Sequence, residues 1–253
     1  MAIRIKNKSQ IDRIKKAGEI VAGCFEIIKP YIKDGVTTKD LERVIADYIK
    51  KCGGTSATKG YGGFPGELCI SVNDTIIHGI PSNKIVIHDG DIVSLDIMVW
   101  YESCVADACR TYEVGEVDAE THRLVEVTKQ SFFEGIKYAR SGHHLNEIGT
   151  AIQKYVEENG FNVIRDFVGH GVGIEVHEEP EICNYDIGRR GPKLEPGMVL
   201  AIEPMVSAGD WEVDILDDEW TVVMQDGSMS AHYENTVLIT DGDPILLTIK
   251  EDE

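Results

Sequence analysis

Two similar helical segments lie 107 residues apart in this sequence, and this repeat constrains the fold more than any other feature. Residues 34–54 and 142–160 both carry apolar residues at helical spacing, and both close on a glycine. Thr37 and Asp40 have the spacing of a capping box at the start of the first segment. Corresponding positions are Gly35, Leu41, Ile45, Tyr48, Ile49 and Gly53 in the first copy and Gly142, Ile148, Ile152, Tyr155, Val156 and Gly160 in the second. Chance is the alternative explanation for one such match, so the repeat is a hypothesis.

Each copy is preceded by another segment of helical periodicity, within residues 11–28 and 124–136, and is followed by runs typical of strands. These runs are rich in β-branched residues and are bounded by Gly, Asp and Pro; they are 84–101, 104–115, 197–206, 219–227 and 233–240. Because helices and strands are grouped rather than alternating, we predict an α+β class with a mostly antiparallel sheet. We expect one domain over residues 1–253, built from two related halves that face each other across a cleft.

The charge argues against nucleic acid as a main partner. Lys and Arg number 25 against 44 Asp and Glu, a formal net charge of −19, and such a surface repels polyanions. We therefore expect no DNA partner. A local exception is the basic cluster in residues 1–16, where a solvated helix face is the ordinary interpretation and contact with the ribosome is the functional one. Its members are Arg4, Lys6, Lys8, Arg13, Lys15 and Lys16.

The N-terminal segment is charged and has no apolar core of the kind that signal peptides carry, and no run of about 18 apolar residues occurs. We expect no membrane partner. Six scattered cysteines without a C-x-x-C pair indicate free thiols in a reducing compartment. We therefore expect a cytoplasmic protein, and we expect it to be a monomer.

Four acidic residues fall inside apolar runs, where a lone buried carboxylate is costly. Asp96 lies in "VSLDIMV" and Asp107 in "CVADACR". A hairpin that turns at Tyr101 and Glu102 would place these two carboxylates opposite each other on one face. Tyr and Glu are not the residues that a tight turn prefers, so a longer turn with the same pairing stays open. The other two acids, Glu203 in "VLAIEPMV" and Glu234 in "AHYENTVLIT", repeat the pattern in the second half.

Each of these carboxylates alone is most often structural, but four that converge repel one another unless cations lie among them. Two divalent ions would balance four negative charges. The stretch "GHGVGIEVHEEP" at residues 169–180 adds His170 and His177, and one neutral imidazole would complete a mixed oxygen and nitrogen set. Such a set suits manganese, iron, cobalt or zinc better than calcium.

Six motifs in order resemble the type I methionine aminopeptidases over essentially the whole chain. They are "VNDTIIHGIP", "GDIVSLD", "DACRT", "GHGVGIEVHEEP", "GMVLAIEP" and "YENTVLIT". The resemblance implies the pita-bread fold, in which two related α+β halves surround a site for two metal ions. It also implies removal of the initiator methionine from nascent polypeptides with a small second residue, by attack of a metal-bound hydroxide on the first peptide bond.

The resemblance implies the metal ligands as well. Asp107 and Glu234 would bridge two divalent ions, Asp96 would bind one ion, and His170 and Glu203 would bind the other. Glu203 would also relay the proton of the attacking water.

For the substrate, the resemblance implies a hydrogen bond from His177 to the scissile amide and a place for His78 near the leaving nitrogen. Taken alone, either histidine is more often a structural residue. An apolar pocket for the methionine side chain would be lined by Tyr61, Phe64, Cys69 and Trp220. Aromatic walls and a thiol suit a polarisable thioether, while core packing is the alternative for any one of them.

Three positions depart from the family pattern. Val176 stands where an aromatic residue or histidine is common, and Ala106 and Ala108 stand where the family has glycine and a hydroxyl residue beside the metal-binding aspartate. These changes concern the shape of the pocket and the hydrogen bonds around one ligand.

Two other functions are consistent with the same fold. The first is an Xaa-Pro peptidase, although such enzymes usually carry a large additional N-terminal domain. The second is a metal-free peptide-binding module, which loss of ligand residues would signal. All five ligand positions hold metal-competent side chains, so we predict an enzyme.

Overall fold

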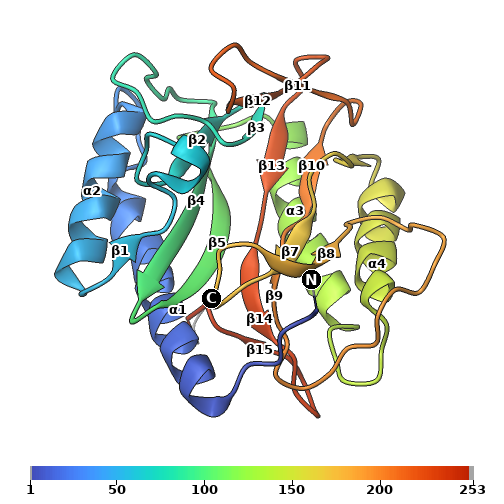
Figure 1. Cartoon of the computed structure of the whole chain (residues 1–253). Coiled ribbons are helices and arrows are strands. Elements are labelled where there is room, and N and C mark those ends of the chain that lie inside the picture. Colours follow the sequence, from blue (N-terminus) through green and yellow to red (C-terminus); the bar gives the residue numbers. More distant parts are fainter. Residues whose placement is uncertain (1, 251–253) are drawn as a thin grey trace.

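A computed structural model of the chain describes residues 2–250 (Figure 1). Two helix pairs lie on opposite sides of the strands: α1 and α2 on one side, α3 and α4 on the other. The helices are α1 (Lys8–Ile28), α2 (Thr38–Lys51), α3 (Ala119–Ile136) and α4 (Leu145–Glu158), and two short 3-10 turns are η1 (Lys29–Tyr31) and η2 (Tyr61–Gly63). No helix within the described residues is long and apolar enough to cross a bilayer.

The strands form four sheets within residues 2–250, and every strand pair in them is antiparallel. This confirms the predicted α+β class. The strands are β1 (Thr55–Ser56), β2 (Cys69–Val72), β3 (Thr75–Ile77), β4 (Ile92–Tyr101), β5 (Cys104–Glu113), β6 (Asn162–Val163), β7 (Gly169–Gly171), β8 (Glu178–Ile182), β9 (Val199–Ile202), β10 (Met205–Ser207), β11 (Val213–Ile215), β12 (Val222–Met224), β13 (Ser230–His232), β14 (Asn235–Leu238) and β15 (Ile245–Leu246).

The two halves match closely in their helices. Helix α4 begins and ends 107 residues after α2, because 145 minus 38 and 158 minus 51 both equal 107. Thr37 caps α2 in the predicted box with Asp40. The glycines before the two helices, Gly35 and Gly142, have φ of 81° and 93°. Residues with a side chain rarely adopt this left-handed backbone conformation, so both turns favour glycine. The chain therefore enters the two helices in the same way.

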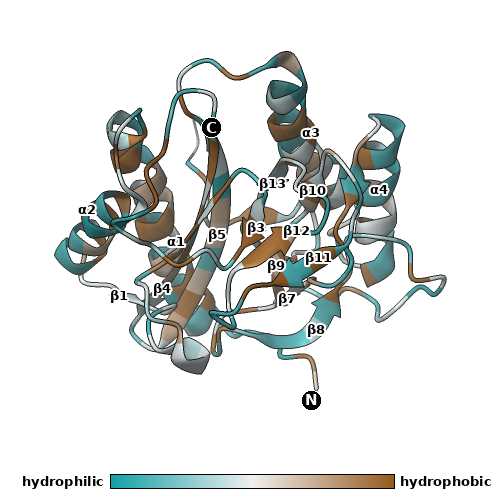
Figure 2. Ribbon diagram, turned by 90° about the horizontal axis from the view of Figure 1, so that it is seen from above, coloured by the Kyte–Doolittle hydropathy of each residue, from teal (hydrophilic) through white to brown (hydrophobic). Residues whose placement is uncertain are grey.

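Each helix pair covers its own apolar core. One cluster packs α1 and α2 against β4 and β5, and another packs α3 and α4 against β9 and β14. Figure 2 shows strongly apolar strands between the helix pairs, while the helices carry both apolar and polar faces. Because the strands are covered by helices, the acids that they carry point into a space between the two halves rather than into solvent.

The hairpin of β4 and β5 differs from the prediction in its register. Asp96 lies opposite Cys109, and Asp107 lies opposite Met98, so the prediction that the two carboxylates oppose each other was wrong. The turn falls at Glu102 and Ser103, one residue later than predicted, and both have positive φ (45° and 62°) as a two-residue primed turn requires. The register therefore moves by two residues, which preserves the alternation of faces, and both carboxylates still point to the same side.

Part of one predicted strand is also absent. In the run 84–101 only residues 92–101 form β4, while Val86 makes a single bridge to Thr37 at the start of α2.

Candidate metal centre

The five predicted ligands come from five different segments and line one cavity of about 130 Å³. Asp96 and Asp107 project from the long strands β4 and β5, and His170 from the short strand β7. Glu203 directly follows β9, and Glu234 lies between β13 and β14. Each half of the chain thus contributes carboxylates to the same space.

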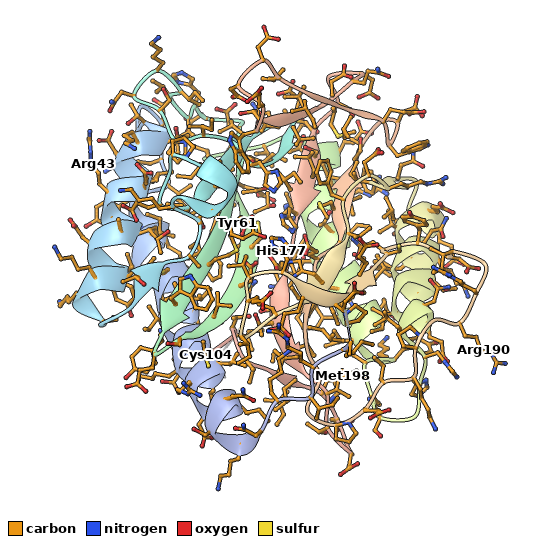
Figure 3. All side chains as sticks on the ribbon, viewed as in Figure 1. Arg43, Tyr61, Cys104, His177, Arg190 and Met198 are labelled. Atoms are coloured by element: carbon orange, nitrogen blue, oxygen red, sulfur yellow. The ribbon has the colours of Figure 1, made fainter. Side chains whose placement is uncertain are left out.

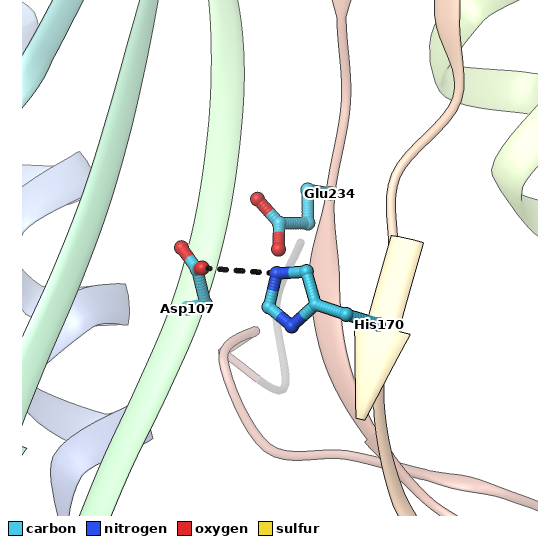
Figure 4. A group of neighbouring side chains, drawn as sticks. All are labelled: Asp107, His170 and Glu234. Carbon is cyan, nitrogen blue, oxygen red and sulfur yellow. Dashed lines mark ion pairs between the residues drawn. The ribbon is translucent and has the colours of Figure 1, made fainter. Parts of the chain in front are cut away.

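Three of these side chains meet closely. Asp107, His170 and Glu234 each offer a ligand atom within 4.8 Å of the others (Figure 4). The Nε2 atom of His170 lies 3.8 Å from Oδ2 of Asp107 and 3.5 Å from Oε1 of Glu203. These separations suit atoms that share an ion, since two ligand atoms at about 2.0 to 2.2 Å from one metal stand roughly 3 to 4 Å apart.

The ring of His170 is arranged as a neutral ligand. Its Nδ1 donates a hydrogen bond of 2.9 Å to the carbonyl oxygen of Gly171, which leaves the lone pair on Nε2 facing the carboxylates. Burial lowers the pKa of His170 to about 3, and the nearby His177 adds to this effect. The contacts between His170 and the carboxylates are therefore not ion pairs near neutral pH; they present an uncharged nitrogen to a negative site.

The carboxylates are strongly perturbed by the loss of water. Burial raises the pKa of Asp96 to about 6. For Asp107, Glu203 and Glu234, burial and then the neighbouring carboxylates raise the pKa well above its usual range. Like charges this close disfavour ionisation unless a cation lies among them.

Several buried oxygens in the cavity also have no hydrogen-bond partner among residues 2–250. They are Oδ1 of Asp96, Oδ1 of Asp107, Oε1 of Glu203 and Oε1 of Glu234. Buried polar atoms are rarely left in this condition. Four convergent carboxylates with free lone pairs, next to a neutral imidazole, are a donor set that fits divalent cations.

The backbone around these residues is held by hydrogen bonds, some of which join the two halves. The hydroxyl of Thr236 accepts from the N–H of Asp107 at 2.9 Å and donates to its carbonyl oxygen at 2.7 Å. Arg110 donates to the carbonyl oxygen of Glu234 at 2.6 Å, and Asn184 donates to that of Glu203 at 2.9 Å. The cavity is therefore held on a rigid frame, as a preformed site requires.

The residues predicted for substrate contact line the same cavity: Tyr61, Phe64, Cys69, His78, His177 and Trp220. Tyr61 and His177 lie side by side (Figure 3), with 2.8 Å between the tyrosine oxygen and Nδ1 of the histidine. Across the cavity, the ring of His78 lies 6.1 Å from that of Trp220 in an edge-to-face arrangement. His78 also has φ of 58°, a value that is uncommon for a non-glycine residue.

The three departures from the family pattern lie outside the cavity. Ala106 and Ala108 are fully buried in the core cluster under α1, on the side of β5 opposite to Asp107. Val176 is also buried in that cluster and does not line the pocket. These substitutions therefore change core packing more directly than they change the walls of the cavity.

Four residues that line the cavity were not predicted from the sequence: Thr58, Ile77, Met98 and His232. Met98 could have been found, since it lies two residues after Asp96 on the same face of β4. His232 lies two residues before Glu234, a signal that was present but weak. Thr58 carries no such signal.

Comparisons with known proteins agree on one family. Residues 12–241 match metallopeptidase family M24. The methionine aminopeptidase of Clostridium acetobutylicum is 49% identical over 249 residues, which cover 98% of this chain and 100% of that protein. Methionine aminopeptidase 1 of Bacillus subtilis is 45% identical over 236 residues, 93% of this chain and 95% of that protein.

Solved structures give the same result. The crystal structure of methionine aminopeptidase from Thermotoga maritima superimposes with a TM-score of 0.97 at 45% identity and covers 98% of this chain and 100% of that one. An Xaa-Pro dipeptidase from Bacillus anthracis reaches 0.80 at 25% identity, and the match covers 98% of this chain but 63% of that one.

The antiparallel α+β fold and the carboxylate-lined cavity define a metal-dependent peptidase of the pita-bread class. The chain belongs to metallopeptidase family M24. The predicted resemblance to methionine aminopeptidases is confirmed.

Proposed function

We propose that this chain is a single catalytic unit that removes the initiator methionine from nascent polypeptides whose second residue is small. One observation carries the proposal: five ligand-type side chains and the predicted methionine-pocket residues line one cavity. Near full-length identity of 49% to a methionine aminopeptidase supports the substrate. An Xaa-Pro substrate has weaker support, because such a relative is 25% identical and extends well beyond this chain.

We propose that two divalent ions, of manganese, iron, cobalt or zinc, are held by Asp96, Asp107, His170, Glu203 and Glu234. When bound, such ions polarise a carbonyl group and lower the pKa of coordinated water to roughly 7. Asp107 and Glu234, which come from opposite halves, are the proposed bridging pair. Four carboxylates balance the charge of two such ions, and this supports a centre that holds two ions rather than one.

Glu203 is the proposed general base. Its side chain lines the cavity, and a ligating carboxylate at this place is within reach of a water molecule held by the ions. After accepting a proton from water, it would release that proton to the leaving amide nitrogen.

His177 is the proposed donor to the scissile carbonyl oxygen. Burial lowers the pKa of His177, so the ring is neutral and carries one N–H. When the hydroxyl of Tyr61 donates to Nδ1 across their 2.8 Å contact, the proton lies on Nε2 and is free to bind the substrate oxygen. Tyr61 thus orients the donor.

His78 is the proposed contact for the leaving nitrogen. Its pKa is lowered to about 4, by burial and then by His177, so it also acts as a neutral ring. Beside it, Phe64 and Trp220 pack edge-to-face with 5.2 Å between ring centroids, and Cys69 is buried at the cavity wall. Together these groups form a proposed apolar pocket for a thioether side chain.

Contact with the ribosome is a further part of the proposal. Lys8 and Lys15 are exposed on α1 and support it. The rest of the basic cluster supports it less: Lys6 is buried against Glu178, and Arg4 and Lys16 are paired with Glu175 and Glu19. We propose that the protein acts as a monomer in the cytoplasm.

The test is hydrolysis of the peptide Met-Ala-Ser by protein that has been stripped with a chelator and then titrated with Mn²⁺, Fe²⁺, Co²⁺ or Zn²⁺. Metal-dependent release of methionine, lost in Glu203→Ala, is the expected result. Cleavage of a Gly-Pro peptide alone would assign the chain to the Xaa-Pro class. No hydrolysis of either peptide with any of the metals would favour a peptide-binding module over an enzyme.

A further inference from the structure

His232 lies at the same cavity and is not explained by the proposed mechanism. It ends β13, and its side chain is 2% exposed. Its Nε2 atom lies 3.8 Å from Oε2 of Glu203 and 4.0 Å from Oε2 of Glu234. His170 lies beside the other carboxylate oxygen of Glu203, with Nε2 at 3.5 Å from Oε1. The two imidazoles therefore flank one carboxylate, each beside a different oxygen.

Neither ring nitrogen of His232 has a hydrogen-bond partner among residues 2–250. A buried imidazole without partners costs free energy, so its retention at this position calls for a ligand. The ring nitrogen that faces the two carboxylates faces the space in which cations are proposed to lie.

The two halves are joined about a local two-fold axis that relates His232 to Asp107. The hydroxyl of Thr236 bonds both the N–H and the carbonyl oxygen of Asp107. In the same way, the hydroxyl of Thr111 accepts from the N–H of His232 at 3.0 Å and donates to its carbonyl oxygen at 2.8 Å. Asp107 thus corresponds to His232 and Thr111 to Thr236, because 232 minus 107 and 236 minus 111 both equal 125.

A third contact lies on the axis itself. The N–H of Glu234 donates to the carbonyl oxygen of Cys109 at 3.0 Å, and 234 minus 109 is again 125. Asp107 and His232 therefore occupy equivalent places on either side of this contact. Since Asp107 offers a ligand atom to the cluster, a ligand atom on His232 would complete the symmetric arrangement.

A histidine that binds metal usually donates its other N–H to a carbonyl, a carboxylate or water. For His232 such a partner can be water, because this residue also lines a second cavity of about 220 Å³, whose other lining residues include members of α1, β5 and α3. Arg110, Thr111 and Lys129 line it as well. A cavity of this size and polarity has room for ordered water.

We propose that His232 is a sixth protein ligand of the metal centre, which binds the ion beside Glu203 and Glu234 through its Nε2 atom. The inference rests on the proposed function, since it requires a metal centre at this cavity. It assigns the centre two nitrogen donors instead of one, which favours the borderline ions zinc, cobalt and iron over manganese.

The test is ¹⁵N NMR of the full chain, labelled at histidine and loaded with Zn²⁺, because a zinc-bound ring nitrogen resonates apart from both the protonated and the free forms. We expect two zinc-bound signals, one lost in His232→Gln and the other in His170→Gln. His122→Gln, at an exposed histidine of α3, should keep both. Zinc affinity of His232→Gln should fall at least about tenfold.

One zinc-bound signal that disappears in His170→Gln and persists in His232→Gln would overturn the inference and leave the proposed function intact. No zinc-bound signal at all would contradict the metal centre itself. The count in the unsubstituted protein does not depend on whether a variant folds, so a poorly folded His232→Gln protein would not obscure the result.

Discussion

Buried carboxylates are the residues at which function opposes stability in this protein. Glu203 and its neighbours lie in a cavity where burial raises their pKa, so their ionised forms destabilise the fold when no cation is bound. A folded-state pKa above the unfolded value means that the folded state binds protons more tightly. Stability in the metal-free protein is therefore lost as pH rises above the unfolded pKa of about 4.5.

Glu203→Gln should therefore stabilise the metal-free protein. The gain in free energy of unfolding relative to the unsubstituted chain should be small near about pH 4 and should grow toward about pH 8, since glutamine has no charge to desolvate. Urea unfolding in chelator at several pH values measures it, with the exposed Glu195→Gln as the control. A difference that is flat or falls with pH would contradict this account of the site.

With metal present, the unsubstituted protein should be more stable than Glu203→Gln. An ion at about 100 times its dissociation constant stabilises a protein by about 2.7 kcal/mol, and the glutamine variant, which lacks one ligand charge, should gain less. Thermal unfolding with and without Zn²⁺ provides the comparison. Equal stabilisation of both proteins would indicate that Glu203 does not take part in binding.

The sequence predicted individual site residues where their chemistry conflicts with their surroundings. Asp96 and Asp107 are acids within apolar strands, and such a conflict can be recognised without a structure. His232 lies with another polar residue, Ser230, in the short stretch "SAH", and its importance depends on the local two-fold axis, which only the fold reveals.

Helix α4 positions Glu203 indirectly through Gly149. A Cβ atom on Gly149 would lie 2.0 Å from the carbonyl oxygen of Cys183, and the next residue, Asn184, donates to the carbonyl oxygen of Glu203. The absent side chain therefore lets the segment that supports Glu203 pack directly against the helix.

Gly149→Ala should consequently destabilise the protein by about 1 to 3 kcal/mol through overpacking. The usual helix preference for alanine over glycine, about 1 kcal/mol, has the opposite sign. Urea unfolding decides which effect is larger, and Lys154→Ala at an exposed position of the same helix is the control. A stabilised Gly149→Ala protein would show that the segment 183–184 moves away at little cost.

The helices were predicted better than the hairpin register and the short strands. The helices have long periodic patterns, and α2 and α4 begin and end close to the predicted segments. The prediction of the hairpin register was wrong by two residues because Glu102 and Ser103 adopt positive φ without being glycine or asparagine, so no residue type marks the turn. Short strands such as β7 and β11, of three residues each, have too few positions for an alternating pattern.

At the scale of the whole molecule, Arg110 joins the two halves. It extends from β5, donates to the carbonyl oxygen of Glu234 and to Asn235, and its guanidinium lies over the rings of Phe25 and Tyr233 at 4.8 and 4.3 Å. Arg110 is 4% exposed. The frame of the metal centre therefore depends on a buried cation that both halves surround.

Arg110→Met should lower the free energy of unfolding by at least about 2 kcal/mol, because buried acceptors lose a charged donor. It should also weaken metal binding, since Glu234 loses its backbone restraint. Denaturant unfolding and metal titration test both effects. Arg43→Met, at an exposed arginine of α2, should change stability by less than about 0.5 kcal/mol, and equal effects of the two substitutions would contradict a joining role.

The central claim is that side chains from both halves together hold divalent ions in the cavity. Anomalous diffraction at the zinc edge, from crystals of the chain soaked in Zn²⁺, tests it most directly. The account predicts two peaks between Asp107 and Glu234, each at about 2.0 to 2.2 Å from their oxygens, and one of the two at that distance from Nε2 of His170. An ordered cavity without a peak, with zinc only on the surface, would contradict it.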